Sequence, residues 1–163
     1  MLAKPTNSIQ EVLKRLEGQR FTLEYKYDGE RVQVHLTEED NAKCFSRNLL
    51  DTSDKFPEVP GYVRAACEDS GVTSFVIDAE VVAYDPEKDM LVPFQVLSTR
   101  KREITLDEAE EGKVKVIVQA FDIMYLNGEN LMQKSLSDRR DLLLKNFKVR
   151  PSEAKAWKED VVL

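Results

Sequence analysis

The sequence has 163 residues and a formal net charge of −6. A chain of this length can bury one hydrophobic core, and its excess of acidic residues argues against strong binding of nucleic acid through overall charge. No apolar run approaches the length that crosses a bilayer. Cys44 and Cys67 have neither metal-ligand spacing nor the density of a secreted disulfide framework. We therefore expect a soluble, intracellular protein with free thiols.

The first predicted element is an amphipathic helix that begins after Ser8 and ends before Gly18. Ser8 can cap its N-terminus, and Glu11 can complete a capping box. Its apolar residues recur at helical spacing, and they are Ile9, Val12, Leu13 and Leu16. We expect this helix to cover one edge of the sheet that follows.

A hairpin is predicted next, with its turn at residues 28–29, an Asp-Gly dipeptide that suits a tight connection. The alternating apolar rows are Phe21, Leu23, Tyr25 and Tyr27 before the turn and Val32, Val34 and Leu36 after it. If both rows face one core, Glu24, Lys26 and Arg31 share the opposite face, within reach of one ligand. The alternation alone also fits an ordinary hairpin with exposed charges. His35 has no cluster of ligand residues around it in the sequence, and we expect it to be a solvated strand histidine.

Three further strands are predicted, at residues 42–47, 72–84 and 114–125. The strand at 72–84 is unusually apolar, and its carboxylates Asp78 and Glu80 fall on one side by the period of two. The strand at 114–125 is apolar almost throughout, which predicts a central strand covered on both faces.

Two further helices are predicted, at residues 59–68 and 135–144. The acidic run at residues 107–111 is expected to be a solvated loop. Residues 148–163 contain mixed charges, one tryptophan and one proline, and their pattern supports no assignment.

The segment Lys-Tyr-Asp-Gly-Glu-Arg at residues 26–31 resembles the nucleotidyltransferase motif of ATP-dependent DNA ligases, RNA ligases and mRNA-capping enzymes. Later segments resemble further DNA ligase motifs in the family's order, at residues 46–48, 78–83 and 120–128. The segments that are similar to the eukaryotic replicative type, DNA ligase I, lie at residues 1–5, 45–48, 93–97 and 99–102. The sequence is therefore identified as a member of the DNA ligase family.

The resemblance implies an α+β fold of antiparallel β-sheets with flanking helices, the ATP-grasp-like adenylation (nucleotidyltransferase) domain of the family. It covers residues 1–147, and residues 148–163 stay unassigned. Ligases of this type carry two more motifs in the same domain, an oligonucleotide-binding-fold domain and an N-terminal DNA-binding domain, none of them recognisable here. We expect a partial adenylation domain, incomplete at its C-terminus, that needs these other domains to seal nicks.

The resemblance also implies the chemistry. Lys26 attacks the α-phosphate of ATP and forms lysyl-AMP, which the full enzyme uses to seal nicked duplex DNA during replication and repair in the nucleus. Only a neutral amine can attack, and with an ordinary pKa near 10.4 about one lysine in 2,500 is neutral at pH 7. Nearby cations must favour deprotonation, and Arg31 and a bound Mg²⁺ are candidates.

Further site residues follow from the resemblance. The implied ligands are the adenine amino group for Glu24, the purine face for Phe121, the ribose for Arg31, and the AMP phosphate or nick for Arg47. Glu80 is implied to hold Mg²⁺ or ribose hydroxyls, with Asp78 as a second candidate for this role. Lys101 and Arg102, with Arg100, are implied to contact the DNA backbone. The residues alone leave other interpretations open, because Arg31 and Arg47 could be surface arginines and Phe121 a core aromatic.

Two alternative functions remain at this stage. One is an RNA ligase or capping-type transferase, which shares the first motif but not the segments typical of DNA ligase I. The other is a catalytically silent fragment that acts as a scaffold or partner-binding module.

Overall fold

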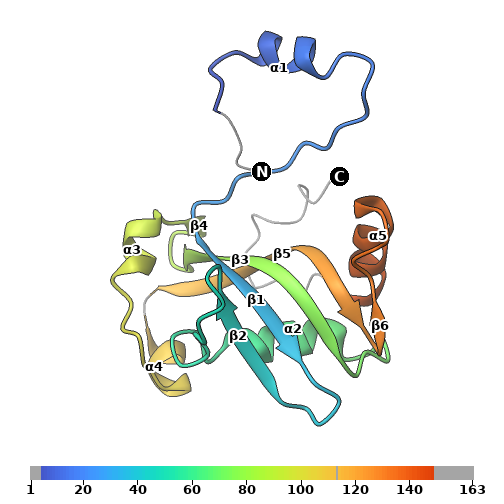
Figure 1. Ribbon diagram of the computed structural model, residues 1–163. Helices are drawn as coiled ribbons and strands as arrows, with labels where there is room; N and C mark the ends of the chain where they lie inside the picture. Colours follow the sequence, from blue (N-terminus) through green and yellow to red (C-terminus); the bar gives the residue numbers. More distant parts are fainter. Residues whose placement is uncertain (1–4, 113, 149–163) are drawn as a thin grey trace.

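A computed structural model describes residues 5–112 and 114–148. Its centre is one antiparallel sheet in the order β2-β1-β3-β5-β6, with β4 paired to the end of β3 (Figure 1). The strands are β1 (Glu30–Leu36), β2 (Ala42–Ser46), β3 (Phe75–Asp85), β4 (Met90–Leu91), β5 (Lys115–Leu126) and β6 (Glu129–Asn130). The helices are α1 (Ile9–Arg15), α2 (Val59–Cys67), α3 (Phe94–Ser98), α4 (Leu106–Glu111) and α5 (Leu136–Asn146). The α+β class with an antiparallel sheet and flanking helices is confirmed.

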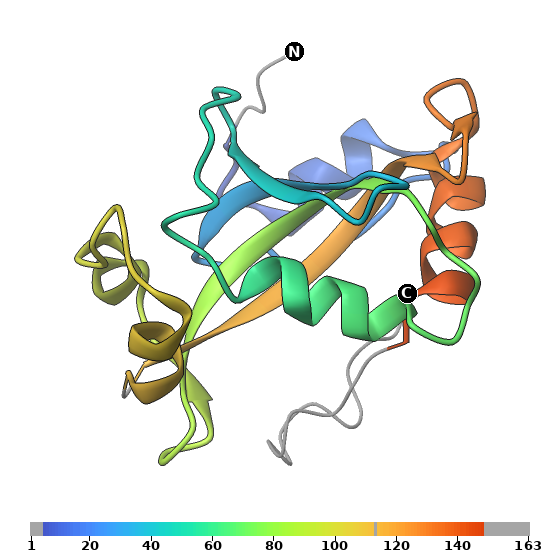
Figure 2. The ribbon, with the colours of Figure 1, turned by 90° about the horizontal axis from the view of Figure 1, so that it is seen from below.

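Strand β3 is the most deeply buried strand, because it pairs with β1 on one edge and β5 on the other. Its alternate residues Ile77, Ala79 and Val81 are fully buried. They join Val32 and Val34 of β1 in one apolar cluster that also contains residues of α2. Figure 2 shows α2 lying across this face of the sheet. The opposite face carries the polar residues of β1 and β3, and the candidate site lies there.

The helix predicted at residues 59–68 is confirmed as α2, which begins at Val59 with Pro60 in its first turn. Val59 and Val63 are buried against the sheet. The helix predicted at 135–144 is confirmed as α5, where the Ser135 hydroxyl accepts a hydrogen bond from the Asp138 N–H at 3.2 Å. The prediction of α5 succeeded because its cap and its apolar residues agree, whereas α2 has no side-chain cap and was predicted by its apolar spacing with a proline in the first turn.

The hairpin predicted around residues 28–29 is wrong in its first half. Residues 20–27 contain no strand, and Phe21, Leu23 and Tyr25 are exposed. The reason is that β1 already has β2 on one edge and β3 on the other, which leaves no edge for a preceding strand. Lys26 is therefore placed on an extended segment that leads into the turn, and not on a hairpin.

Helix α1 forms where it was predicted, and the Ser8 hydroxyl accepts the Glu11 N–H at 3.3 Å. The capping box does not close, because Glu11 accepts a hydrogen bond from the Thr6 hydroxyl at 2.9 Å. No residue of α1 is buried, and Ile9 is 75% exposed. The expectation that this helix covers a sheet edge is wrong for the described part of the chain.

Two further expectations are corrected. The acidic run 107–111 is helical, because Thr105 and Glu108 form a reciprocal capping box at the start of α4. Strand β5 is only partly covered, and Val116 and Ile123 are its buried residues. In the described part of the chain, β5 pairs on its outer edge only with β6, which has two residues. The nearly continuous apolar run of β5 is explained by its contacts with α5 and with the core, each of which covers only part of the strand.

Among the described helices, none is long and apolar enough to cross a membrane. Cys44 and Cys67 are both buried and free, which confirms the expectation from their spacing. Burial raises the pKa of the Cys44 thiol to about 12, so this thiol is protonated at neutral pH.

Phe56, in the loop before α2, should be a main determinant of stability. It is fully buried, and the Lys55 Nζ and Arg100 Cζ lie 5.2 and 5.4 Å from its ring centroid. We expect Phe56→Ala to lower the free energy of unfolding by about 3–5 kcal/mol, measured by urea denaturation. Tyr62→Ala, at a ring that is 45% exposed, should lower it by only about 1 kcal/mol. Equal losses would contradict this assignment.

Candidate active site

The pairing of β1 with β3 assembles the centre of the site. Arg31 lies opposite Glu80, and Gln33 lies opposite Asp78. Because side chains alternate along each strand, these four residues share the face that is not covered by α2. The parity predicted for Asp78 and Glu80 is confirmed by this register.

Asp78 anchors Arg31. Its carboxylate is only 5% exposed and forms an ion pair with the Arg31 guanidinium, whose side chain is 45% exposed. Because the Arg31 side chain is still partly exposed, a ligand can reach its guanidinium, while the buried carboxylate fixes its direction. Asp78 was considered with Glu80 as a possible metal ligand, but in the structure it binds Arg31 and Gln33.

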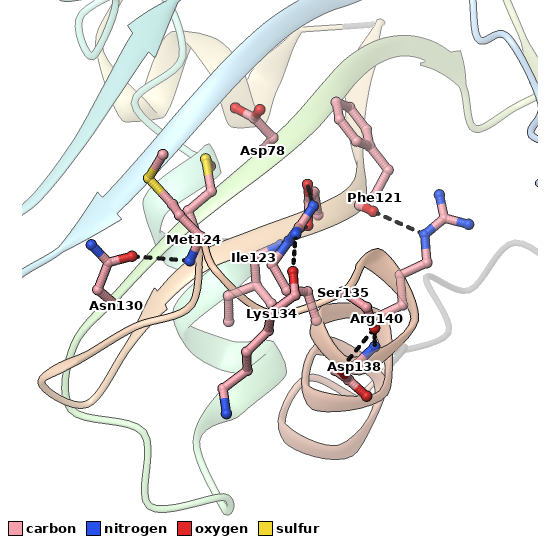
Figure 3. Close-up of polar contacts among 12 residues, drawn as sticks. Asp78, Phe121, Ile123, Met124, Asn130, Lys134, Ser135, Asp138 and Arg140 are labelled. Atoms are coloured by element: carbon pink, nitrogen blue, oxygen red, sulfur yellow. Dashed lines mark hydrogen bonds and ion pairs between the residues drawn. The ribbon is translucent and has the colours of Figure 1, made fainter.

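Phe121 reaches the same face through an irregularity in β5. Ala120 pairs with Ala79 and Asp122 pairs with Asp78, so Phe121 is an additional residue that breaks the regular pairing. Figure 3 shows its ring and the Asp78 carboxylate pointing to the same side of the sheet. The Arg31 Cζ lies 6.0 Å from the Phe121 ring centroid, within cation–π range.

Lys26 and Glu80 lie close enough to influence each other. Burial raises the pKa of Glu80, and the charges of Lys26 and Arg31 oppose that increase. The backbone N–H of Gly29 also opposes the increase in the pKa of Glu80. A Cβ on Gly29 would collide with the Val81 carbonyl oxygen, so this position requires glycine for the close approach of the turn to β3.

The turn itself is tied to α3. The Phe94 N–H, at the start of α3, donates to the Asp28 carboxylate at 3.1 Å. Asp28 directly precedes Gly29, so this bond holds the end of the Lys26 segment against a helix far along the chain. Sequence reasoning used Asp28 only as a turn former and missed this contact, which no local pattern indicates.

Glu24 is bound by a residue outside the group formed by Lys26, Arg31 and Glu80. It forms an ion pair with Arg140 of α5, and the Arg140 Nε also donates to the Phe121 carbonyl oxygen at 3.4 Å (Figure 3). Arg140 thus joins the segment before Lys26 to the strand that carries Phe121. It was not predicted as a site residue, because its helical position gives no sign of this long-range contact.

The predicted cations outside this centre differ in their surroundings. Arg47 is exposed in the turn after β2, directly beyond the Ser46–Val32 pair and therefore beside the strand end that carries Arg31. Lys101 is 76% exposed, with its Nζ 3.4 Å from Glu108, and Arg102 is exposed.

Arg100 is different from its neighbours in the basic segment. It is largely buried and pairs with Glu58 at 2.6 Å. Glu58 is 4% exposed, and Arg100 also lies over the Phe56 ring. Arg100 was grouped with Lys101 and Arg102 as a DNA contact, and its burial in this ion pair contradicts that grouping.

A cavity of about 570 Å³ lies between α3, α4 and the start of β5. Of the predicted site residues in the described chain, only Lys101 lines it. Its lining is largely apolar and includes Leu97, Ile104 and Val116. The cavity is therefore separate from the group formed by Lys26, Arg31 and Glu80, which lies on an open sheet face.

Comparison with known proteins assigns the family. Residues 1–162 match the model described as ATP dependent DNA ligase domain. The chain belongs to this family. DNA ligase 1 of Saccharomyces cerevisiae is 46% identical over 154 residues, and DNA ligase 1 of Drosophila melanogaster is 44% identical over 158 residues. These alignments cover 94% and 97% of the chain and 20% of each relative, so the chain spans about a fifth of their length.

A solved mycobacterial DNA ligase D, complexed with ATP and MES, is also similar. It superimposes with a TM-score of 0.54 at 28% identity, covering 74% of this chain and 34% of that one. Membership of the ATP-dependent DNA ligase family, predicted from the motifs, is confirmed. The adenylation-domain fold is confirmed as well.

The fit of a metal can be tested on the candidate site. In the described residues there is no group of three or more His, Cys, Asp or Glu side chains that could hold an ion. Mg²⁺ commonly uses one or two carboxylates together with substrate phosphates, and Glu80 is a partly buried carboxylate beside Lys26. The site therefore fits a Mg²⁺ that arrives with a nucleotide better than one held by the protein alone.

The partly buried charge of Glu80 should oppose folding at neutral pH. Because its folded-state pKa is raised, the stabilisation by the protonated form is complete below the ordinary value of 4.5 and is lost as pH rises through the raised pKa. We expect Glu80→Gln to be more stable than wild type by about 0.5 kcal/mol near pH 7.5, a value reduced for solvent screening, with a smaller difference near pH 4.

Urea denaturation at the two pH values measures this difference. Glu38→Gln, at an exposed carboxylate in the turn after β1, is the matched control and should change stability little. A Glu80→Gln protein that is less stable at neutral pH would show that the carboxylate stabilises the fold.

Proposed function

We propose that this chain is the nucleotide-binding part of a DNA ligase adenylation domain, in which Lys26 becomes covalently adenylylated. The observation that carries the proposal is the strand pairing that sets Arg31 opposite Glu80, on the sheet face that also presents Phe121, with the Lys26 charge near enough to act on the Glu80 carboxylate. This arrangement offers a nucleophile, a fixed cation, a carboxylate for a hard metal and an aromatic ring to one ligand. The match of residues 1–162 to the ligase domain supports it.

The step is a substitution at phosphorus. The neutral Lys26 amine forms an N–P bond with the α-phosphorus of ATP, the P–O bond to pyrophosphate breaks, and the amine proton leaves to solvent. Charge grows on the phosphate oxygens as this happens, and a positioned cation stabilises it. Arg31 is the cation for this role, because Asp78 holds its guanidinium in place. Before the reaction, Arg31 would contact the ribose of the bound nucleotide.

Glu80 would hold Mg²⁺ or the ribose hydroxyls. When bound, the metal supplies positive charge that neutralises phosphate oxygens and favours a neutral lysine. The similar ligase D was solved with ATP, which supports ATP as the nucleotide here. Glu80 is suited to the role because Gly29, Lys26 and Arg31 already offset part of the penalty of burying its charge.

Phe121 would stack on the adenine, and Glu24 would accept a hydrogen bond from the adenine amino group. The half-buried Phe121 ring faces Arg31 and is not enclosed in the core, which favours a ligand contact over the alternative of a core aromatic. Glu24 is occupied by Arg140 in the structure. Its carboxylate has a second oxygen that can accept from the adenine while Arg140 holds the first.

The wider assignments rest on the family. Residues 1–147 would form part of the adenylation domain, with the DNA-binding and oligonucleotide-binding-fold domains supplied elsewhere in a complete ligase. The substrate would be nicked duplex DNA, which Arg47, Lys101 and Arg102 would contact through phosphates. The DNA ligase 1 relatives support action in replication and repair in the nucleus.

Covalent labelling tests the nucleophile. We expect α-labelled ATP and Mg²⁺ to give an acid-labile label on the protein, and Lys26→Arg to reduce labelling by more than about 10³-fold. The assay uses the chain itself and a chimera in which it replaces the matching 154 residues of the yeast enzyme, which supplies the remaining domains. Lys14→Arg, at an exposed residue of α1, is the matched control and should label normally.

The result separates the alternatives. No label in either protein, with the chimera shown to be folded by circular dichroism, would contradict the proposal and favour a catalytically silent module. A labelled chimera that seals nicked RNA but not nicked DNA would favour an RNA ligase or capping-type transferase.

The basic segment offers a second test, because adjacent arginines have different surroundings. In the chimera, Arg102→Ala should weaken binding to nicked duplex DNA and reduce the salt slope of binding by about one, with little change in stability. Arg100→Ala should instead lower the free energy of unfolding by about 3–5 kcal/mol, because it leaves Glu58 buried without a partner charge. Fluorescence anisotropy and urea denaturation measure the two effects, and the reverse pattern would contradict the assignment.

A further inference from the structure

The exposed face of the sheet carries a continuous row of hydrogen bonds that ends at Arg31. We define the polar row as Arg31, Asp78, Gln33 and His35. We propose that Gln33 and His35 are positioning residues for the adenylylation step, which orient Arg31 through Asp78. The inference rests on the proposed function, because it assigns Arg31 to the nucleotide.

The bonds of the polar row have one direction. An ionised Asp78 can only accept, so the Gln33 group at 3.2 Å from its Oδ1 must be the amide Nε2. The Gln33 Oε1 then faces the His35 Nε2 at 2.7 Å, and this nitrogen must carry a proton to donate. Hydrogen bonds therefore point from His35 to Gln33 and from Gln33 to Asp78, where Arg31 also donates.

Each member of the row is held by packing as well. The His35 ring lies against Phe45 of β2, with centroids 4.8 Å apart. The Gln33 Nε2 also lies 3.7 Å from the Met124 sulfur on β5. Burial lowers the pKa of His35, although the Asp78 charge raises it, so the ring is neutral at pH 7. The row therefore links side chains of β2, β1, β3 and β5 to one guanidinium.

The physical effect acts on the freedom of Asp78. Arg31 is a long side chain that is nearly half exposed, and Asp78 is the carboxylate that fixes it. Without Gln33, the Asp78 carboxylate keeps only Arg31 as a side-chain partner among the described residues and can rotate with it. The guanidinium would then sample more orientations relative to Lys26 and Phe121, and a loosely placed cation stabilises a transition state less well.

A double-mutant cycle in the chimera tests this coupling. Gln33→Met keeps the length of the side chain and removes the amide, and we expect it to slow label formation at saturating ATP about tenfold. In an Arg31→Lys background, where the guanidinium is already lost, the same change should slow it less than twofold. His35→Phe keeps the contact with Phe45 but cannot donate and should slow labelling about threefold, whereas His35→Gln should restore it to within twofold.

Controls separate positioning from stability and from the proposed function. Val63→Ala removes packing on the opposite face of the sheet and should lower stability without changing the labelling rate. If the wild type is labelled and Gln33→Met is labelled at the same rate, the positioning role alone is overturned. The same conclusion holds if the reductions in labelling rate caused by Gln33→Met and Arg31→Lys multiply in the double mutant. No labelling of the folded wild-type chimera would overturn the proposed function and this inference together.

Discussion

The antiparallel pairing of β1 with β3 determines the site more than any other interaction. It places Arg31 opposite Glu80 and Gln33 opposite Asp78, so four polar side chains from distant parts of the chain share one face. A shift of the register by one residue would exchange the two faces of β1 and bury these polar groups against α2. The apolar row of β1, which packs under α2, therefore selects the register and with it the chemistry of the other face.

This arrangement places groups that oppose folding on the face that carries the candidate site. Glu80 is partly desolvated and Asp78 is almost fully buried, and each is compensated by cations and by amide or backbone donors. Pairing of buried charges in this way fixes the orientation of the side chains and adds little to the free energy of unfolding. The far face of the sheet, with its apolar packing, supplies the stability that lets the exposed face hold so many charges.

The sequence predicted features that depend on local spacing. Strand parity predicted that Asp78 and Glu80 share a face, apolar spacing predicted α2, and the Ser135 cap helped to predict α5, because these signals arise within a few residues. The first half of the hairpin failed because alternation from Phe21 to Tyr27 does not show which edges of β1 are already paired. The prediction of a loop at residues 107–111 was wrong because it considered only the acidic charges and not the capping box that begins at Thr105.

Contacts between distant residues account for the parts of the candidate site that the sequence did not reveal. Arg140 lies in a helix and Asp28 in a turn, and nothing in their local patterns connects them to Phe121 or to α3. Gln33 lies two residues from Arg31 in the same strand and therefore on the same face, but only the register and the side-chain contacts of the structure show that it bonds Asp78. Arg100 had the same apparent role as its basic neighbours until its burial beside Glu58 was known.

The irregular pairing of β5 also sets the length that this strand must have. If one residue were deleted at Ala120, the pairing between Asp78 and Ala79 of β3 and the facing part of β5 could become regular, with Phe121 opposite Ala79. Ala79 points into the apolar cluster, so the aromatic ring would turn away from Arg31 and enter a core that has no space for it. The position of Phe121 therefore depends on the number of residues in β5 as well as on their identity.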